Sequence, residues 1–179
     1  MGVLRLEPNL LRITFSVEET LEIHVGIAEY RVARSPQCLL TLGLGSCVGV
    51  VLYDPVLRVG GLAHVMLPDS KQFRVGGKPA KFADLGVEFL ARDLQRAGCS
   101  VGRMMAKLAG GAQMFFGNVR ASQMAVGERN VEAVRSVLHE MRIPIVAEDV
   151  GGTTGRTISL DTTDGRLTVR TLGRAIRVI

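Results

Sequence analysis

The sequence predicts a single α/β domain with mixed, largely antiparallel sheets. Short alternating or apolar segments of strand length recur along most of the chain, and two longer segments carry apolar residues at helical spacing. No Pro- or Ser-rich linker and no repeat divides the chain. A length of 179 residues suits one domain that buries a core. We therefore expect one unit rather than several.

The first half of the chain predicts strands. Residues 22–32 alternate between apolar and polar side chains, which predicts one strand, and residues 38–42 predict a second. A glycine-rich turn and two apolar segments, 47–54 and 60–68, then predict a hairpin. Its loop, 54–59, has a proline directly after an aspartate, which is typical of a turn.

Two amphipathic helices are predicted. The polar segment 69–78 predicts a loop that borders a substrate groove, and Pro79 then begins a helix that Gly98 ends. The predicted apolar face of this helix consists of Phe82, Leu85, Phe89, Leu90 and Leu94. Asn130 is predicted to cap the second helix, which Pro144 stops.

The second half of the chain supplies the remaining strands. They are predicted at residues 103–108, 143–150, 157–160 and 167–171. Gly110 and Gly111 form a turn, either an ordinary one or one that lets the backbone approach the site. Residues 162–165 carry a strong hairpin signal. Asp149 and Arg156 are expected to pair and to fix the glycine-rich loop between them.

Composition narrows the classes of function. The formal charge is +5, but the arginines are spread along the chain and aromatic residues are few, so nucleic-acid binding is not expected. No apolar run reaches membrane-spanning length, and charges interrupt the apolar residues near the N-terminus. The expectation is a cytoplasmic protein without membrane insertion.

The three cysteines, Cys38, Cys47 and Cys99, form a sparse and odd set. This argues against a disulfide framework and against a zinc site. The Cys–His chemistry described below needs no metal or organic cofactor, so none is expected. Cys38 begins an apolar strand and is predicted to lie in the core, and Cys99 is predicted to be structural.

Cys47 has the strongest candidate partner in the chain, His64 on the return strand of the hairpin. A tight register places His64 opposite Cys47, and a register looser by two residues places it opposite Gly49, diagonal to Cys47 on the same face. A register odd by one would separate the two side chains. The alternative is that Cys47 is a buried small hydrophobic residue, which is the commoner role of a free cysteine.

The chemistry that matches a Cys–His pair is covalent acyl transfer. The imidazole takes the thiol proton and later returns it to a leaving amine. Gly43 and Gly45 allow a tight turn before Cys47 that can aim backbone N–H groups at an oxyanion. Thr41, at the end of the preceding strand, either orients the histidine or only ends its strand.

The chain resembles the chemoreceptor glutamine deamidases, the CheD family, in five blocks that follow the family's order. They are TLGLGSCVGVVLYDP (41–55), GGLAHVMLP (60–68), AKLAGGAQMF (106–115), GERNV (127–131), and DVGG (149–152) with the following GR (155–156). The resemblance runs from about residue 25 to about residue 170. Residues 1–22 have no counterpart in it and are interpreted as an N-terminal extension, which leaves 23–179 as the deamidase domain.

The resemblance implies a layered α/β sandwich and a cysteine-dependent protein-glutamine amidohydrolase. The family's cysteine, histidine and threonine fall on Cys47, His64 and Thr41. Gly45, Ser46, Gly110 and Gly111 are further candidates for shaping the site. The implied substrates are the cytoplasmic domains of methyl-accepting chemotaxis receptors, with glutamyl methyl esters as additional substrates.

Two alternatives are retained. The family also binds a CheC-type phosphatase, so the chain could be a regulatory module without turnover. The presence of Cys47, His64 and Thr41 together argues against a loss of activity. A cysteine peptidase would share the chemistry, but no local peptidase signature is present.

Overall fold

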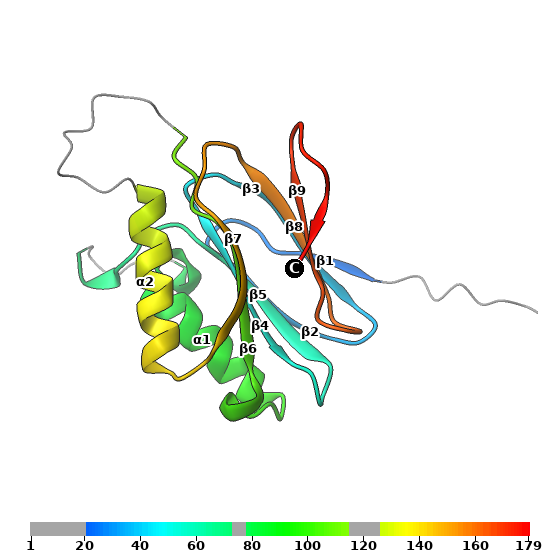
Figure 1. Ribbon diagram of the computed structural model, residues 1–179. Helices are drawn as coiled ribbons and strands as arrows, with labels where there is room; N and C mark the ends of the chain where they lie inside the picture. Colours follow the sequence, from blue (N-terminus) through cyan, green and yellow to red (C-terminus); the bar gives the residue numbers. More distant parts are fainter. Residues whose placement is uncertain (1–20, 73–77, 115–125) are drawn as a thin grey trace, which may run out of the picture.

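The protein is a single mixed α/β domain of three layers, as predicted (Figure 1). The computed structural model describes residues 21–72, 78–114 and 126–179. Within these residues, two five-stranded sheets pack against each other, and two helices cover the far side of one of them. Most of the predicted N-terminal extension and part of the predicted 69–78 loop lie outside the described residues.

The sheet away from the helices, here called the outer sheet, has the order β1-β3-β8-β9-β10. Its strands are β1 (Glu22–His24), β3 (Cys38–Leu44), β8 (Arg156–Asp161), β9 (Leu167–Thr171) and β10 (Arg177–Val178). β1 and β3 pair in parallel, and the other neighbours are antiparallel.

The sheet in the middle, here called the central sheet, has the order β2-β5-β4-β6-β7. Its strands are β2 (Tyr30–Arg34), β5 (Val59–Val65), β4 (Val48–Asp54), β6 (Met105–Gly110) and β7 (Ile145–Val150). Only β6 and β7 pair in parallel among these described strands. All residues of β4 and β5 are buried, because both faces of this sheet are covered.

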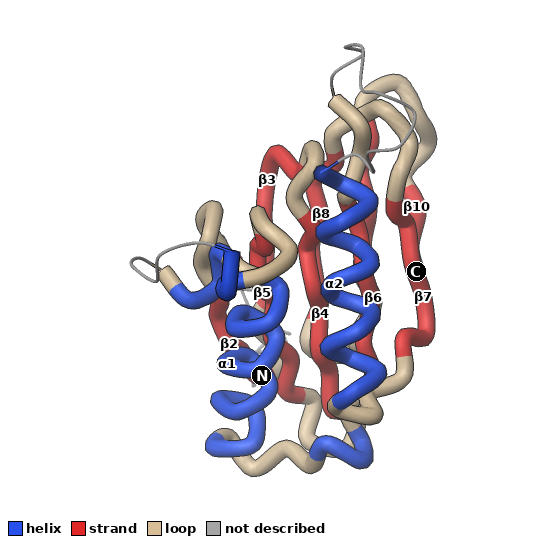
Figure 2. The backbone as a smooth tube through the Cα atoms, turned by 90° about the vertical axis from the view of Figure 1, so that its left-hand side faces the viewer, coloured by secondary structure: helices blue, strands red, loops and turns tan. Residues whose placement is uncertain are grey.

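The two helices are α1 (Ala83–Arg96) and α2 (Val126–Glu140), and they lie side by side on the central sheet (Figure 2). Three short 3₁₀ turns of the described chain connect the larger elements: Ser70–Gln72, Pro79–Lys81 and Val101–Arg103. Within the described residues, neither helix has the length and apolarity that crossing a membrane requires.

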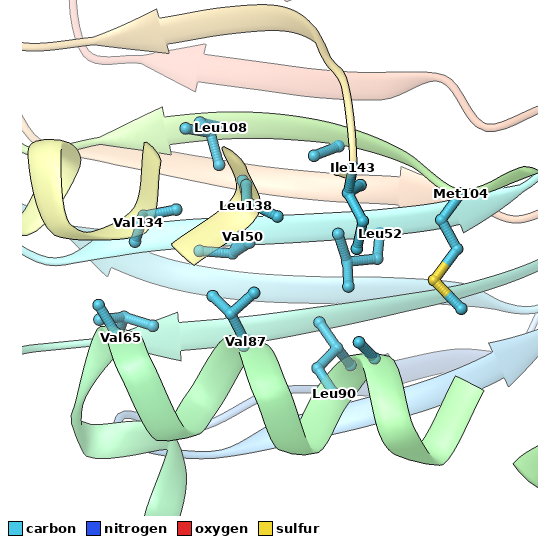
Figure 3. Close-up of a cluster of buried hydrophobic side chains, with 14 of the residues drawn as sticks. Val50, Leu52, Val65, Val87, Leu90, Met104, Leu108, Val134, Leu138 and Ile143 are labelled. Atoms are coloured by element: carbon cyan, nitrogen blue, oxygen red, sulfur yellow. The ribbon is translucent and has the colours of Figure 1, made fainter. Parts of the chain in front are cut away.

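Two apolar cores hold the layers together. The first lies between the helices and the central sheet, where side chains such as Val87, Val134 and Leu138 meet Val50 and Leu52 of β4 (Figure 3). The second lies between the two sheets and is built from inward-facing residues of both. Its described members include Leu39, Leu44, Val51, Tyr53, Leu62, Ile158 and Leu160. The candidate site residues belong to this second space.

The predicted apolar face of the first helix is partly wrong. The residues of α1 that are buried are Ala83, Gly86, Val87, Leu90, Ala91 and Leu94, whereas Leu85 and Phe89 are only half-buried. α1 lies close to β5, and its Leu90 fits over Gly61. A Cβ on Gly61 would come within 2.4 Å of Leu90 Cδ1.

The segment predicted as one strand over residues 22–32 is two strands in different sheets. β1 pairs in the outer sheet and β2 in the central sheet, with a turn between them that contains Ala28 at φ 60°. Ile23 of β1 packs in the core between the sheets, whereas Val32 of β2 packs in the core under the helices. The inward apolar positions therefore change from odd to even numbers at the turn, and the exposed Ile27, which continues the odd series, hides this change.

Other boundaries shift by a few residues, and two local predictions differ in kind. α2 begins at Val126, so Asn130 lies in its second turn and does not cap it. Cys38 is half-exposed and does not lie in the core, whereas Cys99 is buried. The predicted pair of Asp149 and Arg156 is confirmed, with Oδ1 and Nε 2.9 Å apart.

Candidate active site

The hairpin of β4 and β5 adopts the looser of the two registers that leave Cys47 and His64 on one face. His64 lies opposite Gly49, and Val65 lies opposite Val48. Cys47 is half-buried and packs against the core between the sheets. Ala63 and Val65, the neighbours of His64 on β5, face the helices. Because successive side chains of a strand point to opposite faces, the His64 imidazole faces the outer sheet, as Cys47 does. The two side chains therefore enter the same space between the sheets.

Thr41 reaches the imidazole from the opposite sheet. Thr41 lies on β3 and is buried, and its Oγ1 is 2.8 Å from His64 Nδ1. The same hydroxyl donates to the carbonyl oxygen of Val25 at 2.7 Å. A hydroxyl has one hydrogen, and a carbonyl can only accept. Thr41 Oγ1 therefore accepts from His64 Nδ1–H, which leaves Nε2 as the nitrogen with a free lone pair.

The environment of His64 keeps the imidazole neutral. Its side chain is fully buried, and this burial lowers the pKa of His64 to about 4. Nε2 is buried and has no hydrogen-bond partner among the described residues. At neutral pH the ring is therefore an uncharged base whose free nitrogen is available to take a proton.

Cys47 rests as a neutral thiol. Burial raises the pKa of the Cys47 thiol, and its own backbone N–H opposes this rise. No hydrogen bond joins its sulfur to His64 within the described parts of the chain. The resting pair is thus a thiol beside an imidazole, not a thiolate–imidazolium pair. Catalytic contacts are often looser in a free enzyme than in the reacting complex.

The loop that leads to Cys47, residues Gly43–Cys47 and here called the Cys47 loop, carries the chain from the outer sheet to the central sheet. Gly43 has φ 70°, and the N–H of Gly45 bonds to the Gly43 carbonyl at 3.0 Å. Ala112 N–H donates to the Gly45 carbonyl at 2.7 Å. The N–H of Cys47 has no acceptor other than its own sulfur among the described residues. It is free to bind a developing oxyanion.

Gly110 and Gly111 lie against the backbone of Cys47. Gly111 N–H donates to the Cys47 carbonyl at 2.8 Å. Gly110 has φ 111°, and a Cβ there would lie 2.3 Å from the same carbonyl oxygen. Of the two alternatives for this turn, the structure has the close backbone approach.

Asn130 belongs to the candidate site, and the prediction that it caps α2 is wrong. Its Nδ2 donates to the carbonyl of Ser46 at 2.9 Å and to the carbonyl of Met66 at 2.8 Å. Ser46 is therefore tied to the site through its backbone. Asn130 directly precedes Val131 on the buried stripe of α2, and a polar residue on such a stripe was the available signal.

Within the described ranges, no group of three or more His, Cys, Asp or Glu side chains is arranged to hold a metal ion. The site consists of a thiol, an imidazole, a hydroxyl and backbone amides. What it can do chemically is nucleophilic acyl transfer with proton transfer by His64.

The chain belongs to the CheD family. The family model described as "CheD chemotactic sensory transduction" matches residues 66–171, which begin just after His64. A "Probable chemoreceptor glutamine deamidase CheD" from Desulforamulus reducens is 54% identical over 88% of this chain and 95% of its own length. A protein of the same name from Moorella thermoacetica is 52% identical over 88% of this chain and 95% of its own length. The hypothetical protein YfiH of Bacillus licheniformis, a solved structure, covers 67% of this chain with a TM-score of 0.40 and 18% identity.

Proposed function

We propose that this chain is a protein-glutamine amidohydrolase that converts glutamines of chemotaxis receptors to glutamates. The names of its relatives support this substrate. The observation that carries the chemistry is the arrangement of His64. Its Nδ1–H is held by Thr41, and its Nε2 is buried, unpartnered within the described residues and on the same face as Cys47.

Acylation begins when a receptor glutamine places its side-chain amide beside Cys47. His64 Nε2 takes the thiol proton as the sulfur attacks the amide carbon, and the oxygen becomes an oxyanion that the Cys47 N–H can bind. Collapse of this intermediate breaks the C–N bond. His64 returns its proton to the leaving nitrogen, and ammonia departs from a thioester on Cys47.

Deacylation reverses the same proton transfers. His64 takes a proton from a water molecule, whose oxygen attacks the thioester carbon, and the S–C bond breaks. The sulfur regains the proton, and the receptor leaves with a glutamate. A glutamyl methyl ester would form the same thioester with methanol as the leaving group, so methylesterase activity is part of the proposal.

The proposed partner is the cytoplasmic domain of a methyl-accepting chemotaxis receptor, which places the reaction in the cytoplasm. A CheC-type phosphatase is a second proposed partner. A regulatory module without turnover would need neither a buried neutral base nor a hydroxyl that fixes its tautomer, and both groups are present.

The test uses a purified receptor cytoplasmic domain and mass spectrometry of its peptides. Each deamidated glutamine gains about 1 Da as the thioester is hydrolysed. Wild type should produce this shift, and Cys47→Ala should not. Cys38→Ala and Cys99→Ala are the matched controls and should retain turnover. Deamidation by folded Cys47→Ala at a rate near that of wild type would refute the proposal.

A further inference from the structure

Asn130 joins the two segments that carry Cys47 and His64. Ser46 directly precedes Cys47 at the start of β4, and Met66 follows shortly after His64 at the end of β5. Both carbonyls accept from the same amide nitrogen, at 2.9 Å and 2.8 Å. The amide belongs to α2, a third element, which packs on the opposite face of the central sheet from Thr41.

The orientation of this amide is fixed by its partners. A carbonyl oxygen can only accept, so the nitrogen of Asn130 must face both carbonyls, and its two hydrogens are both used. Its Oδ1 is buried and has no partner among the described residues. An unpaired buried acceptor is unfavourable, and native proteins keep such groups rarely. The bridge to the two carbonyls is retained in spite of this.

Among the described residues, the other anchors of the Cys47 loop do not involve β5. Gly111 holds the Cys47 carbonyl, and Ala112 holds the Gly45 carbonyl, both from the segment after β6. Among the described side chains, only that of Asn130 donates hydrogen bonds to the backbone beside both Cys47 and His64. Since no hydrogen bond joins the sulfur to the imidazole at rest, their separation depends on the backbone that carries them.

We propose that Asn130 is a positioning residue that sets the distance between Cys47 and His64 by holding the Ser46 and Met66 carbonyls with one amide. The inference rests on the proposed function, because it assigns Asn130 a part in the same acyl transfer. Asn130 touches no reacting atom and acts through the backbone. Misplacement by a fraction of an ångström is enough to slow such a reaction.

The decisive variant is Asn130→Asp. It keeps the shape of the side chain, removes both N–H donors and turns acceptors toward two carbonyls. The matched control is Val134→Ala, which opens a cavity in the same helix at a fully buried position away from the loop. Both variants should lower Tm, so any difference between their activities reports on more than stability.

The first readout is steady-state deamidation of the receptor domain. We expect kcat of Asn130→Asp to fall by about tenfold or more with KM within about threefold, since positioning affects the transition state more than binding. Val134→Ala should retain kcat. Equal kcat values for the two variants at matched stability would overturn the proposal.

The second readout does not need turnover. The rate at which iodoacetamide alkylates Cys47 is compared with and without His64→Gln, in wild type and in each variant. If Asn130 positions Cys47 beside His64, the His64→Gln change should slow alkylation in wild type and in Val134→Ala. It should have no further effect in Asn130→Asp. Undiminished coupling in folded Asn130→Asp would overturn the proposal.

The two readouts separate the possible failures. If wild type does not deamidate the receptor, the proposed function fails, and the alkylation cycle still decides the role of Asn130. If His64 has no effect on alkylation in wild type, the proposed base fails, and the kcat comparison decides. If Asn130→Asp does not fold, Asn130→Ser replaces it, because serine retains one donor. A kcat equal to that of wild type in Asn130→Ser would overturn the positioning role of Asn130.

Discussion

His64 differs from a surface histidine because it is completely buried and, among the described residues, only its Nδ1 has a hydrogen-bond partner. Thr41 holds Nδ1–H, and the Thr41 hydrogen is itself directed to the Val25 carbonyl. The tautomer is thus set by a chain of two hydrogen bonds that ends at a carbonyl, which cannot donate. Sequence alone left open whether Thr41 orients His64 or only ends its strand, and it could not show that Val25 directs the proton.

Thr41→Val tests this chain of hydrogen bonds. The variant keeps the β-branched shape and removes the hydroxyl, so the imidazole can shift its proton to Nε2 and lose its free base. We expect kcat to fall on the order of 100-fold and stability to fall by about 1–2 kcal/mol, because a buried N–H and a carbonyl lose their partner. Thr41→Ser retains the hydroxyl and should keep most of the activity. Full activity in Thr41→Val would show that Cys47 and His64 act without it.

The pH dependence follows from the lowered pKa of His64. Burial holds this pKa at about 4, so the ring is neutral over the whole range above that value and becomes protonated only below it. We expect kcat/KM to stay level between neutral pH and about pH 5 and to fall through about pH 4, provided the protein remains folded. Circular dichroism at each pH supplies that control. An acid limb near 6.5, the ordinary value, would contradict a buried neutral base.

The lowered pKa of His64 also affects stability. Between about pH 6.5 and about pH 4 the unfolded chain binds a proton that the folded chain does not bind. Above the unfolded pKa, His64 is neutral in both states and does not lower the free energy of unfolding. As the pH falls from the unfolded pKa toward the folded one, the free energy of unfolding decreases. The decrease should be absent in His64→Gln.

Among the elements, the hairpin of β4 and β5 shows which features of the site the sequence can predict and which it cannot. Cys47 and His64 share a face only in registers that differ by an even number of residues, and the sequence left two such registers open. The structure has the looser register, in which Asp54 lies opposite Val59 and Arg58 in the loop takes φ 51°. Nothing in the sequence of this loop predicts a positive φ at an arginine. Asn130 was misassigned because a polar residue near a helix start is typical of a cap.

Gly110, at the end of β6, offers a test of backbone packing at Cys47. In Gly110→Ala the new Cβ would strain a positive φ and meet the Cys47 carbonyl at 2.3 Å. Gly173→Ala is the control, with φ 72° and nothing within 4 Å. The control should lose about 1–2 kcal/mol from strain alone and keep its kcat. Gly110→Ala should lose more stability, and its kcat should fall by about tenfold or more. Equal kcat in the two folded variants would contradict this role.

On the scale of the whole molecule, the candidate site exists because two sheets are held in register. Thr41 comes from the outer sheet, His64 comes from the central sheet, and Cys47 directly precedes the central strand β4. Periodicity shows that a strand has an inward face, but it does not show which sheet the strand joins. This is why the fold class could be predicted and the change of sheet within residues 22–32 could not.

Two side chains of β8 fit over glycines of the central sheet. A Cβ on Gly49 would meet Ile158 Cδ1 at 2.5 Å, and a Cβ on Gly60 would meet Leu160 Cδ2 at 2.8 Å. Ile158 also lies opposite Thr41 in the outer sheet. The Gly49 contact therefore lies at the level of the candidate site, whereas Gly60 lies at the other end of β5.

Alanine at these glycines separates sheet packing from site geometry. Both Gly49→Ala and Gly60→Ala overpack the space between the sheets and should cost about 1–3 kcal/mol in urea unfolding. Only Gly49→Ala should lower kcat, since it moves Ile158 and with it the strand that carries Thr41. A Gly60→Ala variant with the same loss of kcat would show that the effect is general loosening of the sheets.

The most direct test of the account is to trap the thioester that it requires. Wild type is mixed with a receptor cytoplasmic domain, stopped in acid after a short time and digested, and the peptides are mapped by mass spectrometry. The account predicts a receptor peptide, less one ammonia, joined to the peptide that contains Cys47, and no such adduct in Cys47→Ala. A receptor adduct on Cys38 or Cys99, or continued deamidation by Cys47→Ala, would contradict it.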